Sequence, residues 1–180
     1  MNDFIIIAVT PPERYPEEAE RINFLLSGGF VDFVHIRKPS YSFEDIEILV
    51  KSIKTEFLHR LKIHDHFELL QKYDLGGVHL NSRNYIFPIN AKSISISIHS
   101  LKEMENKEGY DYFFISPVFD SISKEGYRAA FDLKELSKHI QGRNAIALGG
   151  VTPDKFELLK SLGFKGAALL GHFFPLHHIQ

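Results

Sequence analysis

The chain alternates between short apolar runs and segments with helical spacing, and this alternation limits the folds that it can adopt. The apolar runs are rich in β-branched and aromatic residues, which favours β-strands. We recognise eight of them, at residues 4–9, 31–36, 61–65, 76–80, 93–98, 111–116, 144–148 and 166–171. Strands that alternate with helices predict a parallel sheet, because parallel neighbours need a crossover connection.

Four of the intervening segments carry helix signals. They are residues 16–29, 42–59, 132–140 and 152–163. The first begins with a proline and acidic residues and ends at two glycines. The last has Thr152 as its expected N-cap, Pro153 in its first turn and Gly163 at its end. These signals support a fold built from βα units.

Eight strands are the number found in a (β/α)8 TIM barrel. The chain has 180 residues, which is short for that fold, so we expect a compact barrel with shortened units. Residues 81–91 look like one shortened βα unit, since Pro88 comes too late for a good helix. The alternative is a doubly wound open sheet, and periodicity alone leaves both open. We expect one domain over residues 1–180.

The run at residues 93–98 is unusual because serines alternate with isoleucines. A period of two places Ser95, Ser97 and His99 on one face of the strand. Interior strands of parallel sheets are normally apolar throughout, so this face requires polar partners. The interior of a barrel beneath a ligand site would supply them. The alternative is an edge strand whose serines face water.

Polar side chains follow the ends of most predicted strands, where parallel α/β folds hold their ligands. Basic and hydroxyl-bearing residues outnumber carboxylates there, which suits an anionic ligand. These residues are His35, Arg37, Lys38, His64, Asp65, His66, His79, Asn81, Arg83, Asn84, Ser97, His99, Ser100, Ser116, Ser121, Ser123 and Lys124.

Glycines end the last two predicted strands, at Gly149-Gly150 and at Leu170-Gly171. Backbone N–H groups freed by glycine, together with a helix N-terminus, form a phosphate site. Barrels often place that site after strands seven and eight. We therefore predict a phosphate cup here, with tight turns alone as the alternative.

The loop after the sixth strand offers Ser121, Ser123 and Lys124 to a second phosphate, or to a diphosphate shared with Arg37. His35 and Arg37 occupy positions of the same parity, so both are expected to face the same ligand.

Lys38 is a candidate phosphate ligand, although a solvated side chain is the simpler interpretation. Asp65 is a candidate Mg²⁺ ligand, since Mg²⁺ often uses one or two carboxylates plus phosphate oxygens. The alternative for Asp65 is an N-cap of the segment at 67–73. A zinc site at His64 and His66 is disfavoured because the spacing supplies no third ligand.

Composition excludes several classes of protein. The chain has no cysteine, so disulfides and thiolate metal sites are ruled out. Its net charge of -2 offers no basic field for nucleic acid. No stretch approaches the roughly 20 apolar residues that a membrane span needs. We expect a cytoplasmic protein with no membrane or nucleic-acid partner, and the sequence leaves open whether it forms a homo-oligomer.

Together these residues resemble the thiamine-phosphate synthase and TenI family of (β/α)8 barrels. The resemblance runs from about residue 4 to residue 174. It is carried by the segments HIRKP, IHDHFELLQKYDLGGVHL, SISIHS, DYFFISPVFDSISKEG, ALGGVTPDKF and GFKGAALLG.

For the synthase branch, the resemblance implies that a hydroxymethylpyrimidine diphosphate is joined to a thiazole phosphate, with loss of pyrophosphate assisted by Mg²⁺. Arg37 and Lys124 would neutralise the departing diphosphate, Ser97 would lie close to it, and Asp65 would hold the metal. Ser121 and Ser123 replace the usual threonines of the family. The glycine pairs Gly149-Gly150 and Leu170-Gly171 would hold the thiazole phosphate.

The chain departs from the synthase pattern at several positions. His35 stands where the family has glutamine, and Lys38-Pro39 replaces the expected spacing of the second cation. His64 stands where the family has asparagine before Asp65. The second acidic residue after the VHL segment appears as Arg83 or Asn84, so one Mg²⁺ ligand has gone.

The TenI branch is the alternative. It tautomerises a thiazole carboxylate phosphate without a metal, and the resemblance places His99 as the acid or base, since imidazoles titrate near neutral pH. A structural hydrogen bond that ties down its own loop is the other interpretation of His99. A further alternative is a non-catalytic binder of a phosphorylated pyrimidine or thiazole.

Overall fold

The strands form a closed parallel barrel in the order β1-β2-β3-β4-β5-β6-β7-β8, with β8 pairing back to β1. The structure is a computed structural model, which describes residues 4–105, 107–120 and 129–175. The strands are β1 (Ile5–Val9), β2 (Phe33–Ile36), β3 (Leu61–Ile63), β4 (Gly77–Leu80), β5 (Ile94–Ile98), β6 (Tyr112–Ile115), β7 (Ala145–Leu148) and β8 (Gly166–Leu169). The predicted (β/α)8 barrel is confirmed, and the open-sheet alternative is wrong.

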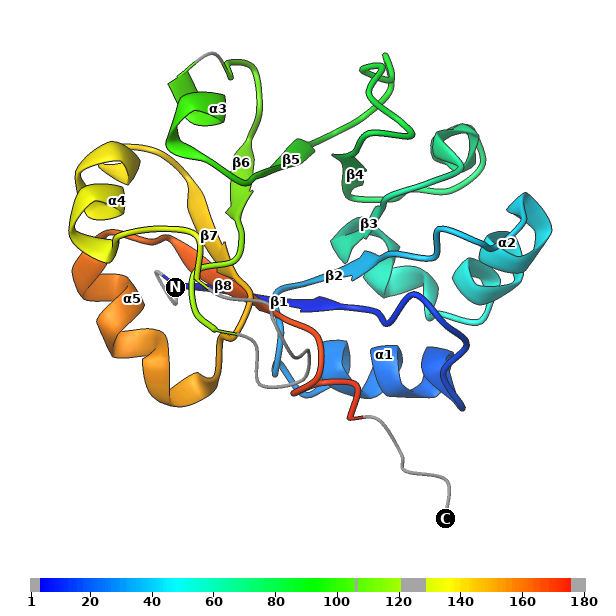
Figure 1. The fold of residues 1–180 in the computed structure, drawn as a ribbon. Coiled ribbons are helices and arrows are strands. Elements are labelled where there is room, and N and C mark those ends of the chain that lie inside the picture. The colour runs from blue at the N-terminus through cyan, green and yellow to red at the C-terminus, as the bar shows by residue number, and fades with distance from the viewer. Residues whose placement is uncertain (1–3, 106, 121–128, 176–180) are drawn as a thin grey trace.

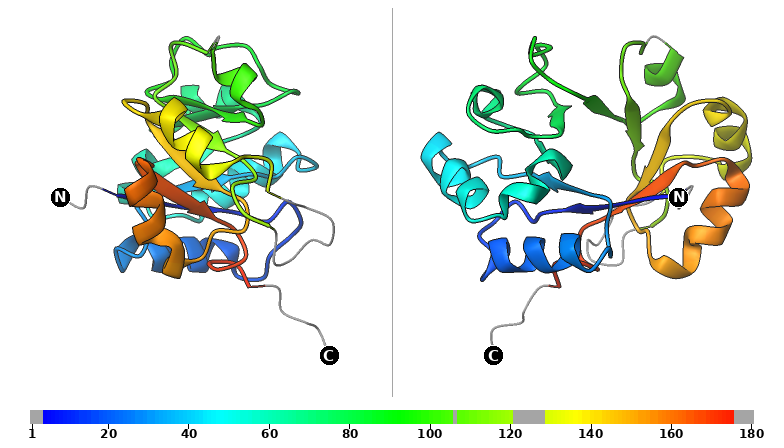
Figure 2. Two further views of the ribbon diagram at one scale, coloured as in Figure 1. Left: turned by 60° about the vertical axis from the view of Figure 1, so that its left-hand side comes forward. Right: turned by 180° about the vertical axis from the view of Figure 1, so that it is seen from behind.

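The helices lie outside the ring of strands (Figures 1 and 2). They are α1 (Glu18–Ser27), α2 (Phe43–Lys51), α3 (Leu101–Glu105), α4 (Leu133–Ile140) and α5 (Phe156–Leu162), with 3-10 turns η1 (Thr55–Arg60), η2 (Phe67–Gln71) and η3 (Pro153–Lys155). Within the described part of the chain, no helix has the length and apolarity to cross a membrane.

Two helix predictions need correction. The segment predicted as one helix over 42–59 divides into α2 and η1. Its predicted start is correct, since a capping box between Ser42 and Asp45 begins α2. Thr152 precedes η3 but its side chain makes no capping hydrogen bond. Pro153 does occupy the first position of that turn.

The segment 81–91 contains no helix, as the sequence predicted for a shortened unit. It begins instead with a turn organised by Asn81, whose side-chain oxygen accepts from the backbone N–H groups of Arg83 (2.9 Å) and Asn84 (3.2 Å). The side-chain amide of Asn81 donates to the carbonyl of His64 at 2.6 Å. The turn is therefore fastened to the end of β3.

The interior of the barrel is divided into an apolar half and a polar half. The apolar half comes from β1, β6, β7 and β8 and includes Ile7, Val9, Phe114, Ile146 and Ala168. The polar half comes from β2 to β5 and includes buried His35, Lys62, His64, His79 and Ser95. The serine face of β5 thus lies in the barrel interior, and the edge-strand alternative is wrong. Because the polar groups line the side of the interior formed by β2 to β5, a polar ligand is expected at the carboxyl ends of these strands.

Candidate active site

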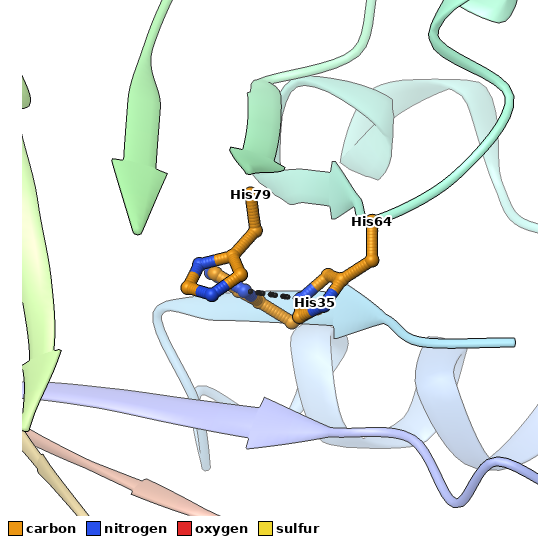
Figure 3. Close-up of side chains that lie close together, drawn as sticks. All are labelled: His35, His64 and His79. Atoms are coloured by element: carbon orange, nitrogen blue, oxygen red, sulfur yellow. Dashed lines mark hydrogen bonds between the residues drawn. The ribbon is translucent and has the colours of Figure 1, made fainter. Parts of the chain in front are cut away.

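Three imidazoles from neighbouring strands meet inside the barrel (Figure 3). His35 comes from β2, His79 comes from β4, and His64 follows β3 directly. His35 Nδ1 and His64 Nε2 are 3.0 Å apart and share a hydrogen bond. The rings of His64 and His79 are stacked with their centroids 4.3 Å apart. The alternation of side chains along each parallel strand turns all three toward one point.

Hydroxyl groups complete this histidine cluster, by which we mean His35, His64 and His79. His79 bonds Ser95 Oγ through Nδ1 (2.9 Å) and Ser97 Oγ through Nε2 (3.0 Å). His35 Nε2 lies 2.5 Å from the hydroxyl oxygen of Tyr112. Ser97 therefore joins the histidine cluster through His79, and its predicted position next to a diphosphate stays a prediction.

Lys62, which pairs with His35 in the register of β2 and β3, is a further buried polar residue of the barrel interior. Its ammonium donates to Ser93 Oγ at 2.5 Å and lies 4.0 Å from the centroid of the Tyr112 ring. Burial lowers the pKa of Lys62 to about 7, because the charged form loses its hydration.

The histidine cluster is held in its neutral form. Burial lowers the pKa of His35 and His64 well below the ordinary value, and neighbouring imidazoles lower it further. Burial, followed by the charges of Lys62 and Arg37, lowers the pKa of His79 to about 3. Neutral imidazoles offer one donor and one acceptor each, and both nitrogens of His35 and of His79 bond neighbouring side chains. The cluster is therefore an uncharged network of internal hydrogen bonds.

The cluster brings three potential metal-ligating nitrogens within 4.8 Å of one another. However, these nitrogens already bond each other or hydroxyl groups. The positive charges of Arg37 and Lys62 also act on the cluster and oppose a cation. The arrangement therefore suits an anion near its open end better than it suits a metal ion.

Arg37 supplies positive charge at the mouth of the barrel. Its backbone N–H donates to Thr10 Oγ1 at 2.9 Å, which ties the end of β2 to the end of β1. Its charge contributes to lowering the pKa of both His64 and His79, after the larger effect of burial. Arg37 thus lies at the end of β2 near the histidine cluster, and its role as a diphosphate ligand stays a prediction.

Asp65 follows β3, next to the end of β2, but it is engaged by the turn after β4. Arg83 approaches its carboxylate through Nε (3.1 Å) and Nη2 (3.0 Å), and Asn84 Nδ2 donates to it at 2.8 Å. The 3-10 turn η2 is preceded by His66 and has no side-chain cap, so the N-cap alternative for Asp65 is wrong.

The donor set around Asp65 does not fit Mg²⁺ as the chain arranges it. Its one carboxylate is neutralised by a guanidinium, and the neighbouring positions supply an arginine and an amide. Mg²⁺ would have to displace Arg83 and would then gain only one protein carboxylate.

Lys38 is neither a phosphate ligand in this arrangement nor a solvated side chain, as the sequence had suggested. It is buried rather than solvated, and its Nζ lies 2.8 Å from Glu18 Oε1 and donates to the carbonyl oxygen of Glu13 at 2.6 Å. Burial lowers the pKa of Lys38 and raises that of Glu18 despite their contact. These contacts direct the ammonium toward α1, so Lys38 joins β2 to that helix instead of extending the histidine cluster.

Gly149 and Gly150 form the rim after β7, and both have positive φ values, of 90° and 62°. A Cβ atom on Gly149 would lie 2.8 Å from Pro117, and one on Gly150 would overlap the carbonyl of Asp120. Only glycine allows the loop after β6 to approach this closely. The backbone N–H of Gly150 makes no hydrogen bond to another described residue, so it can donate to a ligand.

The segment Leu170-Gly171, after β8, does not have the predicted form. Leu170 lies at the end of β8, and residues 171–173 form a turn rather than a helix N-terminus. Gly171 is exposed, with open space where a side chain would lie. Among the described residues, a helix therefore follows Gly149-Gly150 but not Leu170-Gly171, the two segments predicted to form the phosphate cup.

His99 occupies the rim between β5 and β6. Its Nδ1 donates to the carbonyl oxygen of Ser116 at 2.9 Å, and its backbone N–H donates to Glu103. A carbonyl only accepts, so the proton of the neutral imidazole is on Nδ1 and the lone pair is on Nε2. His99 thus has a structural hydrogen bond, to the end of β6 rather than within its own loop, and its acid–base role stays a prediction.

Ser121, Ser123 and Lys124 lie outside the described residues, and their predicted roles remain predictions. In contrast, the structure adds Lys62, Tyr112 and Thr10, which we did not predict. A signal was present for Lys62 and Tyr112, since each shares the parity of an interior residue on its strand, His64 and Phe114 respectively.

A cavity of about 680 Å³ lies outside the barrel, between α1 and the segment that includes α2. Four carboxylates line it, those of Glu17, Glu18, Glu20 and Asp45. Their charge opposes a phosphorylated ligand, so the barrel mouth is the better candidate for the active site.

Comparison with known proteins gives one consistent result. The family model described as thiamine monophosphate synthase (TMP-TENI) matches residues 6–173. The thiamine-phosphate synthase of Syntrophomonas wolfei is 26% identical over 164 residues, which are 84% of this chain and 78% of that protein. The thiamine-phosphate synthase of Desulfitobacterium hafniense is 30% identical over 160 residues, with coverages of 81% and 76%.

Solved structures agree with these relatives. The thiamine phosphate pyrophosphorylase of Bacteroides thetaiotaomicron superposes with a TM-score of 0.79 and 35% identity, over 93% of this chain and 83% of that one. The thiamine phosphate pyrophosphorylase of Pyrococcus furiosus has a TM-score of 0.78 at 20% identity, covering 99% and 91%, and this likeness supports the fold alone.

Proposed function

The chain belongs to the thiamine-phosphate synthase and TenI family, and from this premise we propose that it is a transferase of thiamine biosynthesis. It joins hydroxymethylpyrimidine diphosphate to thiazole phosphate, forms thiamine phosphate and releases pyrophosphate. The relatives bear the name of this activity, and the mouth of the barrel offers groups that suit phosphorylated substrates.

The observation that carries the proposal is the position of Arg37 beside the neutral histidine cluster. The reaction breaks the bond between the pyrimidine methylene carbon and a diphosphate oxygen, and the electron pair leaves with the diphosphate. The lone pair of the thiazole nitrogen then forms the new C–N bond. Arg37 neutralises charge that develops on the leaving group, which is where a fixed cation accelerates the reaction most.

The remaining groups divide the work of binding. The neutral imidazoles of His35, His64 and His79 add no positive charge next to a developing carbocation. Ser97, held by His79, donates its hydroxyl hydrogen to an oxygen of the leaving group. The N–H of Gly150 supports the thiazole phosphate, and Lys124 is proposed as a second cation for the diphosphate.

The proposal is tested by incubating the pure full-length chain with both substrates and following thiamine phosphate by chromatography. We expect product, and we expect its rate to fall in Lys124→Ala. If no thiamine phosphate forms with or without Mg²⁺, the transferase proposal is wrong.

One observation favours a second candidate. The turn after β4 places Arg83 and Asn84, and no second carboxylate, beside Asp65. This suits the metal-independent tautomerisation of a thiazole carboxylate phosphate, in which His99 Nε2 would be the acid or base. Conversion of that compound by the same preparation, lost in His99→Ala, would support the tautomerase. Binding of either phosphorylated ligand without either reaction would support a non-catalytic binder.

A cytoplasmic location belongs to the same proposal and is supported by the absence of cysteine. Whether the chain forms a homo-oligomer is decided by its mass in solution.

A further inference from the structure

Arg83 lies against Asp65, at the position where the family resemblance would place a metal ion. The guanidinium makes three contacts with the carboxylate: Nε to Oδ1 (3.1 Å), Nη2 to Oδ1 (3.0 Å) and Nη2 to Oδ2 (3.2 Å). Such a side-on pair fixes the plane of the guanidinium as well as its position.

The turn after β4 holds this arrangement in place. Asn84 Nδ2 donates to Asp65 Oδ1 at 2.8 Å and to the carbonyl of His64 at 3.3 Å. Asn81 bonds the same carbonyl and accepts from the backbone N–H of Arg83. The shortened βα unit thus brings Arg83 to the barrel mouth by backbone and side-chain contacts that do not depend on a ligand.

The two partners differ in exposure, which shows where a ligand can reach. The side chain of Asp65 is only 11% exposed, whereas that of Arg83 is 45% exposed. The Nη1 group of Arg83 makes no hydrogen bond to a described residue. The carboxylate is therefore covered by its partners, while one edge of the guanidinium remains open to a second anion.

We propose that Arg83 replaces the metal ion: its guanidinium, held by Asp65, binds the departing diphosphate together with Arg37. Transfer therefore does not require Mg²⁺. The inference rests on the proposed transferase function. When the C–O bond breaks, the electron pair stays on the diphosphate, and two guanidinium groups offset its charge. Arginine suits this role because its planar donors match two phosphate oxygens at once.

The first experiment measures binding of inorganic pyrophosphate to the full chain by calorimetry, after treatment with a chelator. The wild type should bind without metal, and Arg83→Ala should bind at least about tenfold more weakly, because a charge-assisted contact is lost. Lys160→Ala is the matched control, since it removes an exposed cation that is also ion-paired, to Glu157 on α5. Binding that appears only with Mg²⁺, or that Arg83→Ala leaves unchanged, overturns the inference.

The second experiment measures turnover with and without chelator. Thiamine phosphate formed at an undiminished rate in the absence of metal supports the inference. Product that forms only with Mg²⁺ overturns it while leaving the transferase function intact. If no product forms under any condition, the transferase function fails, and the pyrophosphate arm still decides whether Arg83 binds a diphosphate.

Two further variants separate charge from folding. Arg83→Lys keeps the charge but loses the planar donor pair, so it should retain part of the affinity that Arg83→Ala loses. Arg83→Asp places a second carboxylate beside Asp65 and should make pyrophosphate binding depend on Mg²⁺. Pyrophosphate binding by Arg83→Asp that equals the wild type without metal would contradict the proposal. Circular dichroism of each variant checks that the fold is kept.

Discussion

His35 Nδ1 lies 3.0 Å from His64 Nε2, so imidazoles from two adjacent strands share a hydrogen bond inside the barrel. Such a bond between two imidazoles needs at least one unprotonated nitrogen. Burial enforces this condition by lowering the pKa of both rings. The polar half of the barrel is therefore stable only while the histidine cluster stays neutral, and this has a measurable consequence.

The free energy of unfolding should fall as the solution becomes acidic. The pKa of His79 is 6.5 when unperturbed and about 3 in the folded chain, mainly because of burial. Between these values the unfolded chain binds more protons, so stability is complete above pH 6.5 and declines as the pH falls toward 3. The loss from His79 alone should reach about 2 kcal/mol at pH 5.

Urea unfolding at pH 7.5 and pH 5 measures this loss, and His79→Gln should reduce it. His139→Gln is the control, because His139 is exposed on α4. An equal pH dependence in the wild type and His79→Gln would show that His79 titrates normally in the folded chain.

Removing the charge at the mouth of the barrel should impair transfer without unfolding the protein. Arg37→Ala is expected to lower kcat/KM at least about tenfold, since charge-assisted contacts to phosphates contribute roughly 1.5–3 kcal/mol. Arg37→Lys should recover part of the loss. Steady-state kinetics and thermal unfolding of the same preparations check this, and unchanged kinetics in Arg37→Ala would exclude the side chain from the site.

Breaking the buried Lys38–Glu18 pair should destabilise the protein strongly. Lys38→Met leaves the buried carboxylate of Glu18 without its cation, and the expected cost is roughly 3–5 kcal/mol. Replacing both residues with apolar ones should restore much of the stability, since no buried charge then remains. By comparison, Lys92→Ala breaks an exposed pair with Asp74 and should cost no more than about 1 kcal/mol.

Urea denaturation of these variants gives the free energies directly. A loss for Lys38→Met no greater than that for Lys92→Ala would mean that the buried pair does not contribute to folding.

Gly150→Ala should damage the phosphate rim more than a matched glycine substitution elsewhere. Gly150 and Gly142 both have positive φ, of 62° and 72°, so alanine costs about 1–2 kcal/mol at either. Only at Gly150 would the new Cβ overlap the backbone of the loop after β6, since it meets nothing within 4 Å at Gly142. We expect Gly150→Ala to be the less stable variant and to bind thiazole phosphate more weakly. Equal stability and equal affinity in the two variants would contradict this.

Much of the site could be predicted because strand periodicity is local. The parity of residues along a parallel strand decides which side chains face the barrel interior, so His35 and Arg37, or Ser95 and Ser97, could be grouped from their spacing alone. The glycines that follow β7 and β8 could also be located from the sequence, because they come directly after apolar runs. However, parity does not say which residues of different strands touch, and Lys62 and Tyr112 were missed for that reason.

The amino-acid sequence by itself determined the order of the strands, the shortened unit at 81–91 and the strand ends that carry polar groups, but it did not indicate α3. Only the tertiary structure decided that the sheet closes, because the pairing of β1 with β8 joins segments at opposite ends of the chain. It also decided the partners of charged residues: Lys38 pairs with Glu18, and Asp65 pairs with Arg83. A charged side chain can reach any of several partners of opposite sign, and the choice among them depends on distances that exist only after the chain has folded.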